Sequence, residues 1–147
     1  MEIGILGGGI AGLSVALALH QQGYQPRVYE RRAEPAPMGA GVTLWPNAGF
    51  VLQELGLLRD IEAVGGRPVM AHRYDEAGNA LGGVDIALLD RTMGYPTQTV
   101  LRRDLQAVLL KHAARAGIPV EFGHRAAAID LDAHGRAVAH FENGVSI

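Results

Sequence analysis

The 147-residue sequence contains no cysteine, one lysine and two serines. Without cysteine the chain cannot form disulfides, thiol redox centres or cysteine-ligated zinc and iron–sulfur sites. The single lysine, Lys111, falls within a predicted amphipathic helix, which argues against Schiff-base chemistry. Ser14 also falls in a predicted helix and outside any G-x-S-x-G turn, so the sequence does not indicate a serine hydrolase.

Long apolar runs and an excess of positive charge are also missing. No run approaches the about 20 apolar residues that span a bilayer, and the apolar N-terminus has no basic leader. We therefore expect a cytoplasmic protein without a membrane partner. The net charge of −2, with no basic stripe, argues against a nucleic-acid partner. The six histidines show no paired metal-ligand spacing, so no metal site is predicted.

Glycine, in contrast, is abundant, and its most informative cluster is a G-x-G-x-x-G pattern at residues 7–12. The pattern follows an apolar run, and Glu30 ends the next one, 18 residues beyond Gly12. In a dinucleotide-binding motif the first glycine allows the tight turn, the second the approach of phosphates, and the third close helix packing. An acidic residue at the position of Glu30 accepts hydrogen bonds from a ribose. The sequence therefore predicts a dinucleotide-binding turn.

Apolar periodicity predicts a βαβ unit in this region, with a strand at residues 2–6, a helix at 13–21 and a strand at 25–30. A loop rich in proline, alanine and glycine is expected at residues 31–43, and its length indicates a binding role. Asp85 and Asp90 lack any motif that would fix them as an acid–base pair. The later patterns predict helices at residues 46–55 and 102–116, and strands at 68–75, 80–88, 120–122, 126–131, 136–141 and from 145 onward.

Four segments of the sequence form a recognisable series in this order: residues 7–12, 29–31, 39–48 and 101–105. Together they resemble the N-terminal part of class A flavoprotein monooxygenases, which include salicylate, p-hydroxybenzoate and urate hydroxylases. The resemblance implies an α/β fold, namely a Rossmann-like FAD-binding domain of the glutathione-reductase type with a βαβ start and a β-meander. It also implies that this domain is incomplete and takes residues 1–66 and 102–147, with a substrate-domain sheet beginning in residues 67–101.

The resemblance further implies which residues contact FAD. Backbone N–H groups of Ile10 and Ala11 would face the pyrophosphate, and Glu30 would bind the adenosine ribose. The backbone of residues 41–43 would approach the flavin, and Arg102 would reach the phosphate–ribityl region. None of the residues is expected to be catalytic. The expected cofactor-binding residues are Gly7, Gly9, Ile10, Ala11, Gly12, Glu30, Arg31, Gly41, Val42, Thr43, Arg102 and Ala126.

Enzymes of this family reduce FAD with NADH or NADPH and then use O2 to hydroxylate a small aromatic substrate. The family's later Asp-Gly and Gly-Asp cofactor segments are not in this sequence, so we interpret the chain as an N-terminal fragment that is inactive alone. Two alternatives stay open: an FAD-dependent reductase or cyclase of the same fold, and a nucleotide-binding module without turnover. The sequence does not predict the substrate, the choice between NADH and NADPH, or the oligomeric state.

Overall fold

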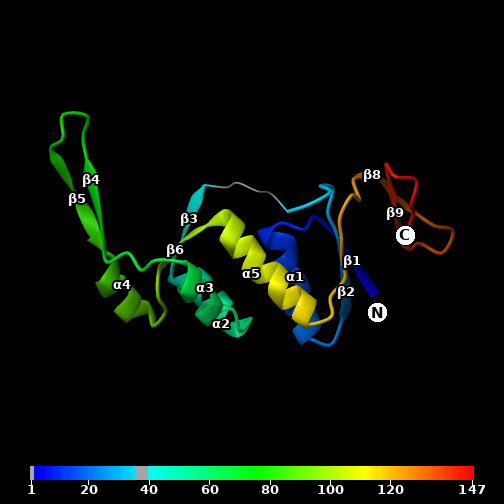
Figure 1. Ribbon diagram of the computed structural model, residues 1–147, viewed down its shortest axis with the longest axis horizontal. Helices are drawn as coiled ribbons and strands as arrows, with labels where there is room; N and C mark the ends of the chain where they lie inside the picture. The colour runs from blue at the N-terminus through cyan, green and yellow to red at the C-terminus, as the bar shows by residue number, and fades with distance from the viewer. Residues whose placement is uncertain (1, 36–39) are drawn as a thin grey trace. The chain divides into compact units, whose positions relative to one another are not determined.

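The computed structural model describes residues 2–35 and 40–147, which form two compact units (Figure 1). The first unit combines residues 1–37 with 106–147, and the second takes residues 38–105. Part of the predicted loop, with Gly39 of the third motif, lies outside the described residues. The assignment of residues 67–101 to a substrate domain stays a prediction.

A parallel sheet forms the centre of the first unit, in which β2 lies between β1 and β7. The crossover helix α1 buries Leu13, Ala16 and Leu17, which recur at helical spacing. The predicted βαβ unit is confirmed. Its elements and the third strand have these bounds: β1 Glu2–Leu6, α1 Ile10–Gln21, β2 Gln25–Tyr29 and β7 Val120–Glu121.

The rest of the first unit consists of the end of helix α5 (Arg102–Arg115) and an antiparallel hairpin of β8 (Ala126–Leu131) and β9 (Ala137–Phe141). The last residues of the chain extend the hairpin, because residues 139 and 147 exchange two backbone hydrogen bonds of 2.9 and 3.0 Å. Tyr29 of β2 packs on Phe141, with ring centroids 5.1 Å apart. This contact joins the hairpin to the parallel sheet.

The second unit has an antiparallel pair, β3 with β6, and a separate hairpin, β4 with β5. Helices α2 and α3 follow β3, and Leu52, Leu57 and Ile61 of this region are buried. The elements have these bounds: β3 Gly41–Leu44, α2 Pro46–Glu54, α3 Leu58–Val64, β4 Met70–Tyr74, β5 Ala80–Asp85, α4 Ile86–Met93 and β6 Gln98–Leu101.

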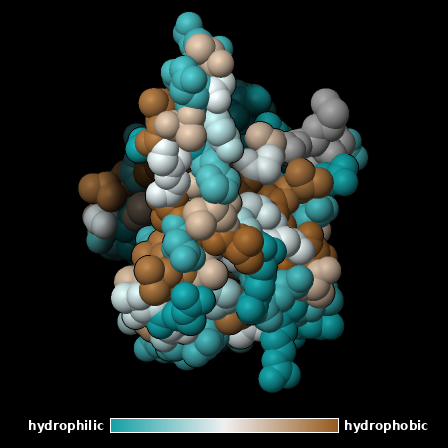
Figure 2. Space-filling model, turned by 90° about the vertical axis from the view of Figure 1, so that its left-hand side faces the viewer, coloured by the Kyte–Doolittle hydropathy of each residue, from teal (hydrophilic) through white to brown (hydrophobic). Residues whose placement is uncertain are grey.

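The β4–β5 hairpin is the most exposed part of the second unit. Every residue of β5 is exposed, as is Val69, with 66% of its surface accessible. Figure 2 faces the end that carries this hairpin and shows apolar side chains interspersed among polar ones. A two-stranded hairpin has little independent stability in water. We therefore expect β4 and β5 to open locally before the parallel sheet does.

Two predicted boundaries were wrong for local reasons. Helix α1 begins at Ile10 and not at Leu13, because Gly9 is its N-cap residue. The strand expected at residues 80–88 ends at Asp85, where α4 begins. The Asp85 carboxylate accepts a hydrogen bond of 2.8 Å from the Leu88 N–H, which is a helix N-cap.

Two further differences from the predicted elements arise from long-range strand pairing and from the shortness of a helix. Residues 41–43 were predicted as loop but belong to β3, whose partner β6 was not predicted either. The register pairs Gly41 with Leu101, far along the chain, so a local pattern could not reveal it. Helix α3 was also missed, since its seven residues are too few for a clear helical period.

Candidate functional site

The glycine-rich turn has the tight bend at Gly7 and the close helix packing at Gly12 that the sequence motif predicted. Gly7 has a φ of +117°, in the region that favours glycine, and its N–H donates to the Tyr29 carbonyl at 2.7 Å. A Cβ on Gly12 would lie 1.9 Å from the Gly7 oxygen, so helix and turn approach too closely for any side chain there. A Cβ on Gly9 would meet no described atom within 4 Å. Packing therefore requires glycine at position 12 but not at position 9.

Glu30 lies directly against this turn. Its Oε2 accepts a hydrogen bond of 2.7 Å from the Gly8 N–H, and its Oε1 accepts one of 3.0 Å from the Arg32 N–H. A Cβ on Gly8 would lie only 2.9 Å from the Glu30 Cβ. The structure thus brings together the two parts of the predicted motif, the glycine turn and the acidic residue after the second strand.

The N-terminus of α1 opens from the same turn. Its N-cap residue, Gly9, has no side chain to cap the helix, and its carbonyl accepts the Leu13 N–H at 3.0 Å. The N–H groups of Ile10, Ala11 and Gly12 come before this first intrahelical hydrogen bond, so the helix itself offers them no i−4 acceptor. Such groups, with the positive end of the helix dipole, favour an anion. A phosphate fits this end of the helix chemically.

Two other predicted residues belong to the same unit. Arg31 follows Glu30 and is exposed. The Glu30 carbonyl accepts the His124 N–H at 2.8 Å, so the segment leading to β8 runs beside the end of β2. Ala126 begins β8 two residues later and is also exposed. Both residues therefore have accessible surface in the unit that carries the glycine turn.

The remaining predicted residues meet in the second unit. Gly41, Val42 and Thr43 lie on β3, which pairs with the strand that leads into Arg102. The Arg102 N–H donates to the Ala40 carbonyl at 3.1 Å. Arg102 and Thr43 are both exposed. The predicted site residues thus form two groups, one in each unit, and the members of each group are far apart in the sequence.

The sequence prediction missed Gln106, whose side chain reaches the glycine turn. Its Nε2 donates a hydrogen bond of 2.8 Å to the Gly8 carbonyl. The one feature of the sequence that could have indicated Gln106 is its place one helical turn after Arg102. Gly8 was missed as well, since it occupies an unrestricted position of the G-x-G-x-x-G pattern.

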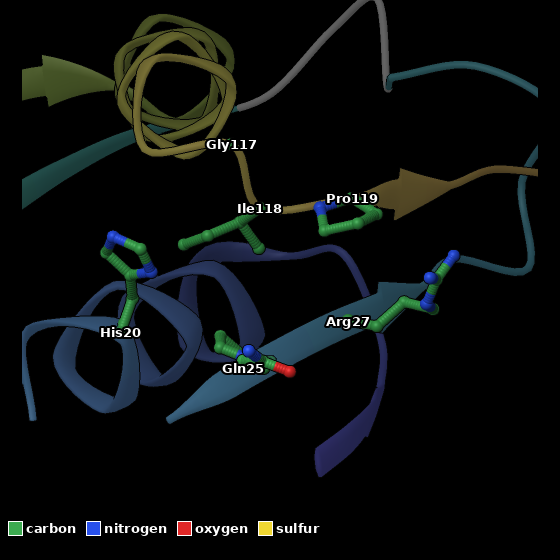
Figure 3. Close-up of a pocket in the computed structure, with 7 residues that line it drawn as sticks. His20, Gln25, Arg27, Gly117, Ile118 and Pro119 are labelled. Atoms are coloured by element: carbon green, nitrogen blue, oxygen red, sulfur yellow. The ribbon is translucent and has the colours of Figure 1, made fainter. Parts of the chain in front are cut away.

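A shallow pocket of about 450 Å³ lies elsewhere in the first unit (Figure 3). His20, Gln25 and Arg27 line it together with the residues that precede β7. It opens at the start of β2, whereas Glu30 follows the end of that strand. Arg27, the lining residue nearest to Glu30 along β2, lies three residues before it, or about 10 Å at the usual rise per residue. The pocket is distinct from the glycine turn.

Three aspartates outside the glycine-rich turn accept hydrogen bonds from nearby residues. Asp90 accepts hydrogen bonds from the Thr97 hydroxyl at 2.6 Å and the Thr97 N–H at 2.9 Å. Hydrogen bonds from Asn79 lower the pKa of Asp75, which lies in the turn between β4 and β5. Hydrogen bonds from Arg136 likewise lower the pKa of Asp132, between β8 and β9. Each of these carboxylates therefore accepts local hydrogen bonds that stabilise the segment around it.

Within the described residues, no cluster of three or more metal-ligating side chains is present. In the same part of the chain, no helix is both long and apolar enough to cross a membrane.

Comparison with known proteins decides the family of the chain. A family model described as FAD binding domain matches residues 1–145. The chain belongs to this family. The chain is 36% identical over 141 residues to the FAD-dependent urate hydroxylase of Klebsiella pneumoniae, covering 94% of this chain and 36% of the relative. It therefore spans about a third of the length of the curated relatives that it matches.

Solved structures agree with this assignment. The chain superposes on Klebsiella pneumoniae HpxO, crystallised with FAD and uric acid, with a TM-score of 0.84 and 31% identity, covering 100% of this chain and 36% of that one. It matches 2-methyl-3-hydroxypyridine-5-carboxylic acid oxygenase with a TM-score of 0.83 and 26% identity, covering 99% and 36%. The predicted resemblance to flavin hydroxylases and the α/β FAD-binding fold are confirmed.

Proposed function

We propose that the chain is the FAD-binding part of a flavin-dependent monooxygenase, which uses NAD(P)H and O2 to hydroxylate a small aromatic substrate. The observation that carries the proposal is the contact between Glu30 and the glycine-rich turn. The contact supports the proposal because a dinucleotide requires a carboxylate for its ribose beside a helix N-terminus for its phosphates. The urate hydroxylase and pyridine oxygenase among the relatives support an aromatic substrate.

The first unit would hold the adenylate half of FAD. The N–H groups of Gly9, Ile10 and Ala11 would donate to the pyrophosphate, and Glu30 would accept from the ribose hydroxyls. A carboxylate has about four lone-pair sites. The described contacts of Glu30 use two of them, one on each oxygen, so it retains capacity for a ribose. Arg31 and Ala126 would line the adenine side.

The second group of residues would serve the remainder of the cofactor. Arg102 would bind the phosphate–ribityl region, because a guanidinium forms paired hydrogen bonds with oxygen-rich anions. The β3 backbone at residues 41–43 would approach the flavin, and Gly41 leaves the side-chain space free there. Bound FAD supplies the redox chemistry, and the protein supplies its position and exclusion of water. No described residue is proposed as catalytic.

The activity is proposed for a whole protein that includes this chain. We expect that protein to contain FAD, to oxidise NADH or NADPH faster when an aromatic substrate is present, and to place one atom of labelled O2 in the product. Nicotinamide oxidation and labelled product would be measured on the same samples. A protein that oxidises NAD(P)H without labelled product would favour the reductase alternative. The cytoplasmic location also stays a prediction.

A further inference from the structure

The backbone of Gly8 is held from two sides. Its N–H donates to the Glu30 carboxylate at 2.7 Å, and its carbonyl accepts the Gln106 amide at 2.8 Å. Gly8 itself is buried, and both hydrogen bonds are partly buried. Partly buried hydrogen bonds are less weakened by competing water than fully exposed ones. Glu30 follows the end of β2 and Gln106 comes from α5, so two distant segments hold the two consecutive peptide groups that meet at Gly8.

Fixing this carbonyl also fixes the next donor. The Gly8 carbonyl and the Gly9 N–H belong to the same planar, trans peptide group, so they point in opposite directions. When Gln106 holds the carbonyl on one side, the Gly9 N–H is directed to the other. Gly9 is exposed, and a Cβ there would meet no described atom within 4 Å. The backbone of Gly9 is therefore open to a ligand.

We propose that Gln106 is a positioning residue for the phosphate-binding turn: its amide holds the Gly8–Gly9 peptide group in the orientation that presents the Gly9 N–H to a pyrophosphate. The inference rests on the proposed binding of FAD. Gln106 does not touch the cofactor in this account and acts through the backbone of the turn. The sequence motif contains no position for such a residue, since it lies 98 residues from Gly8.

Two variants separate a positioning role from simple packing. Gln106→Leu keeps the approximate size of the side chain and removes the donor. Gln106→Glu keeps the size and places an acceptor against the carbonyl at neutral pH, but regains an O–H donor when protonated. Gln53→Leu is the matched control, because Gln53 is an exposed residue of another helix.

The dissociation constant of FAD would be measured by flavin fluorescence from pH 7.5 to pH 5, with melting temperatures recorded in parallel. We expect Gln106→Leu to weaken FAD binding by about 3- to 10-fold, the loss of one hydrogen bond, and Gln53→Leu to leave it unchanged. Gln106→Glu should bind more weakly than Gln106→Leu at pH 7.5. Its deficit relative to wild type should shrink toward pH 5, as the carboxyl gains a proton.

Three results would overturn the proposal. Wild-type affinity in Gln106→Leu would show that the amide does not position the turn, while leaving the proposed FAD site intact. A deficit of Gln106→Glu that does not change with pH, together with a lowered melting temperature, would assign Gln106 a structural role only. Failure of the wild-type chain itself to bind FAD would remove the proposed function of the chain and this inference with it.

Discussion

Substituting alanine at two glycines of the same turn should separate folding from cofactor binding. In Gly12→Ala the new Cβ would lie 1.9 Å from the backbone oxygen of Gly7 and 3.3 Å from the Ile5 Cγ2. A backbone atom cannot rotate away as a side chain can, so the helix must shift from the strand. In Gly9→Ala the new Cβ meets no described atom within 4 Å, and the Gly9 φ of −81° is accessible to alanine.

The two substitutions should therefore differ in their effects on stability and on FAD binding. Overpacking costs about 1–3 kcal/mol, and we expect the upper end for Gly12→Ala because its contact is with the backbone. At roughly 2–4 °C per kcal/mol for a chain of this size, the melting temperature should fall by about 6–12 °C. For Gly9→Ala, a poorer N-cap and a less flexible unfolded chain offset each other to within about 0.5 kcal/mol. Its added methyl, however, stands where the phosphate must approach, so FAD should bind about tenfold more weakly or worse.

Calorimetry of the unliganded proteins and fluorescence titration with FAD would measure the two effects. The reasoning predicts a stability defect in Gly12→Ala and a binding defect without a stability defect in Gly9→Ala. A melting temperature of Gly12→Ala within about 1 °C of wild type would refute the close approach of helix and turn. Wild-type FAD affinity in Gly9→Ala would refute the approach of the cofactor to this backbone.

The remaining predictions concern charged residues. Glu30→Gln should weaken FAD binding about tenfold, because hydrogen bonds to a charged acceptor are the stronger ones; equilibrium dialysis of FAD measures this. Arg102→Ala should weaken it about tenfold or more in the whole protein, where flavin retention after gel filtration is the measure. Asn79→Ala should raise the pKa of Asp75, which Asn79 now lowers below 3.8; the carboxyl carbon shift against pH gives this value. The stabilisation of the β4–β5 turn by this carboxylate is present above pH 3.8 and is lost as pH falls through the lowered pKa.

The Glu30 and Arg102 predictions each have a control variant in the chain, and each of the three predictions can be contradicted. Glu76→Gln changes an exposed acidic residue of the β4–β5 turn and should leave FAD binding unchanged. Arg103→Ala removes the neighbouring exposed cation, which lies 3.3 Å from Asp104. Equal losses in Arg102→Ala and Arg103→Ala would indicate a general effect of charge and contradict a specific role. An unchanged Asp75 titration in Asn79→Ala would contradict the assigned cause.

The sequence predicted the glycine turn well because each requirement of that turn is local. A strand must end, the chain must turn at a positive φ, and a helix must begin close to the strand, so Gly7 and Gly12 are set by their immediate neighbours. The contact with Glu30 was also predictable, since parallel neighbouring strands end at the same edge of a sheet. Confirmation of the family extends this reading to FAD as the cofactor.

The sequence failed where a structure depends on distant pairing. Strand β3 looks like a glycine-rich loop until its partner β6 is known, and neither segment is long enough to reveal the other. Gln106 presents the same difficulty at the site, because its partner is a backbone carbonyl. Every residue has such a carbonyl, so no residue type at position 8 indicates the contact.

The most direct test of the central claim is a competition measurement on the chain. Its glycine turn, Glu30 and helix end are assigned to the adenylate half of FAD, so ADP should compete with FAD more strongly than FMN, which lacks the adenylate. Isothermal titration of FAD in the presence of excess ADP or FMN measures both. We predict that ADP weakens the apparent binding of FAD more than FMN does. FMN that displaces FAD while ADP has no effect would contradict this prediction.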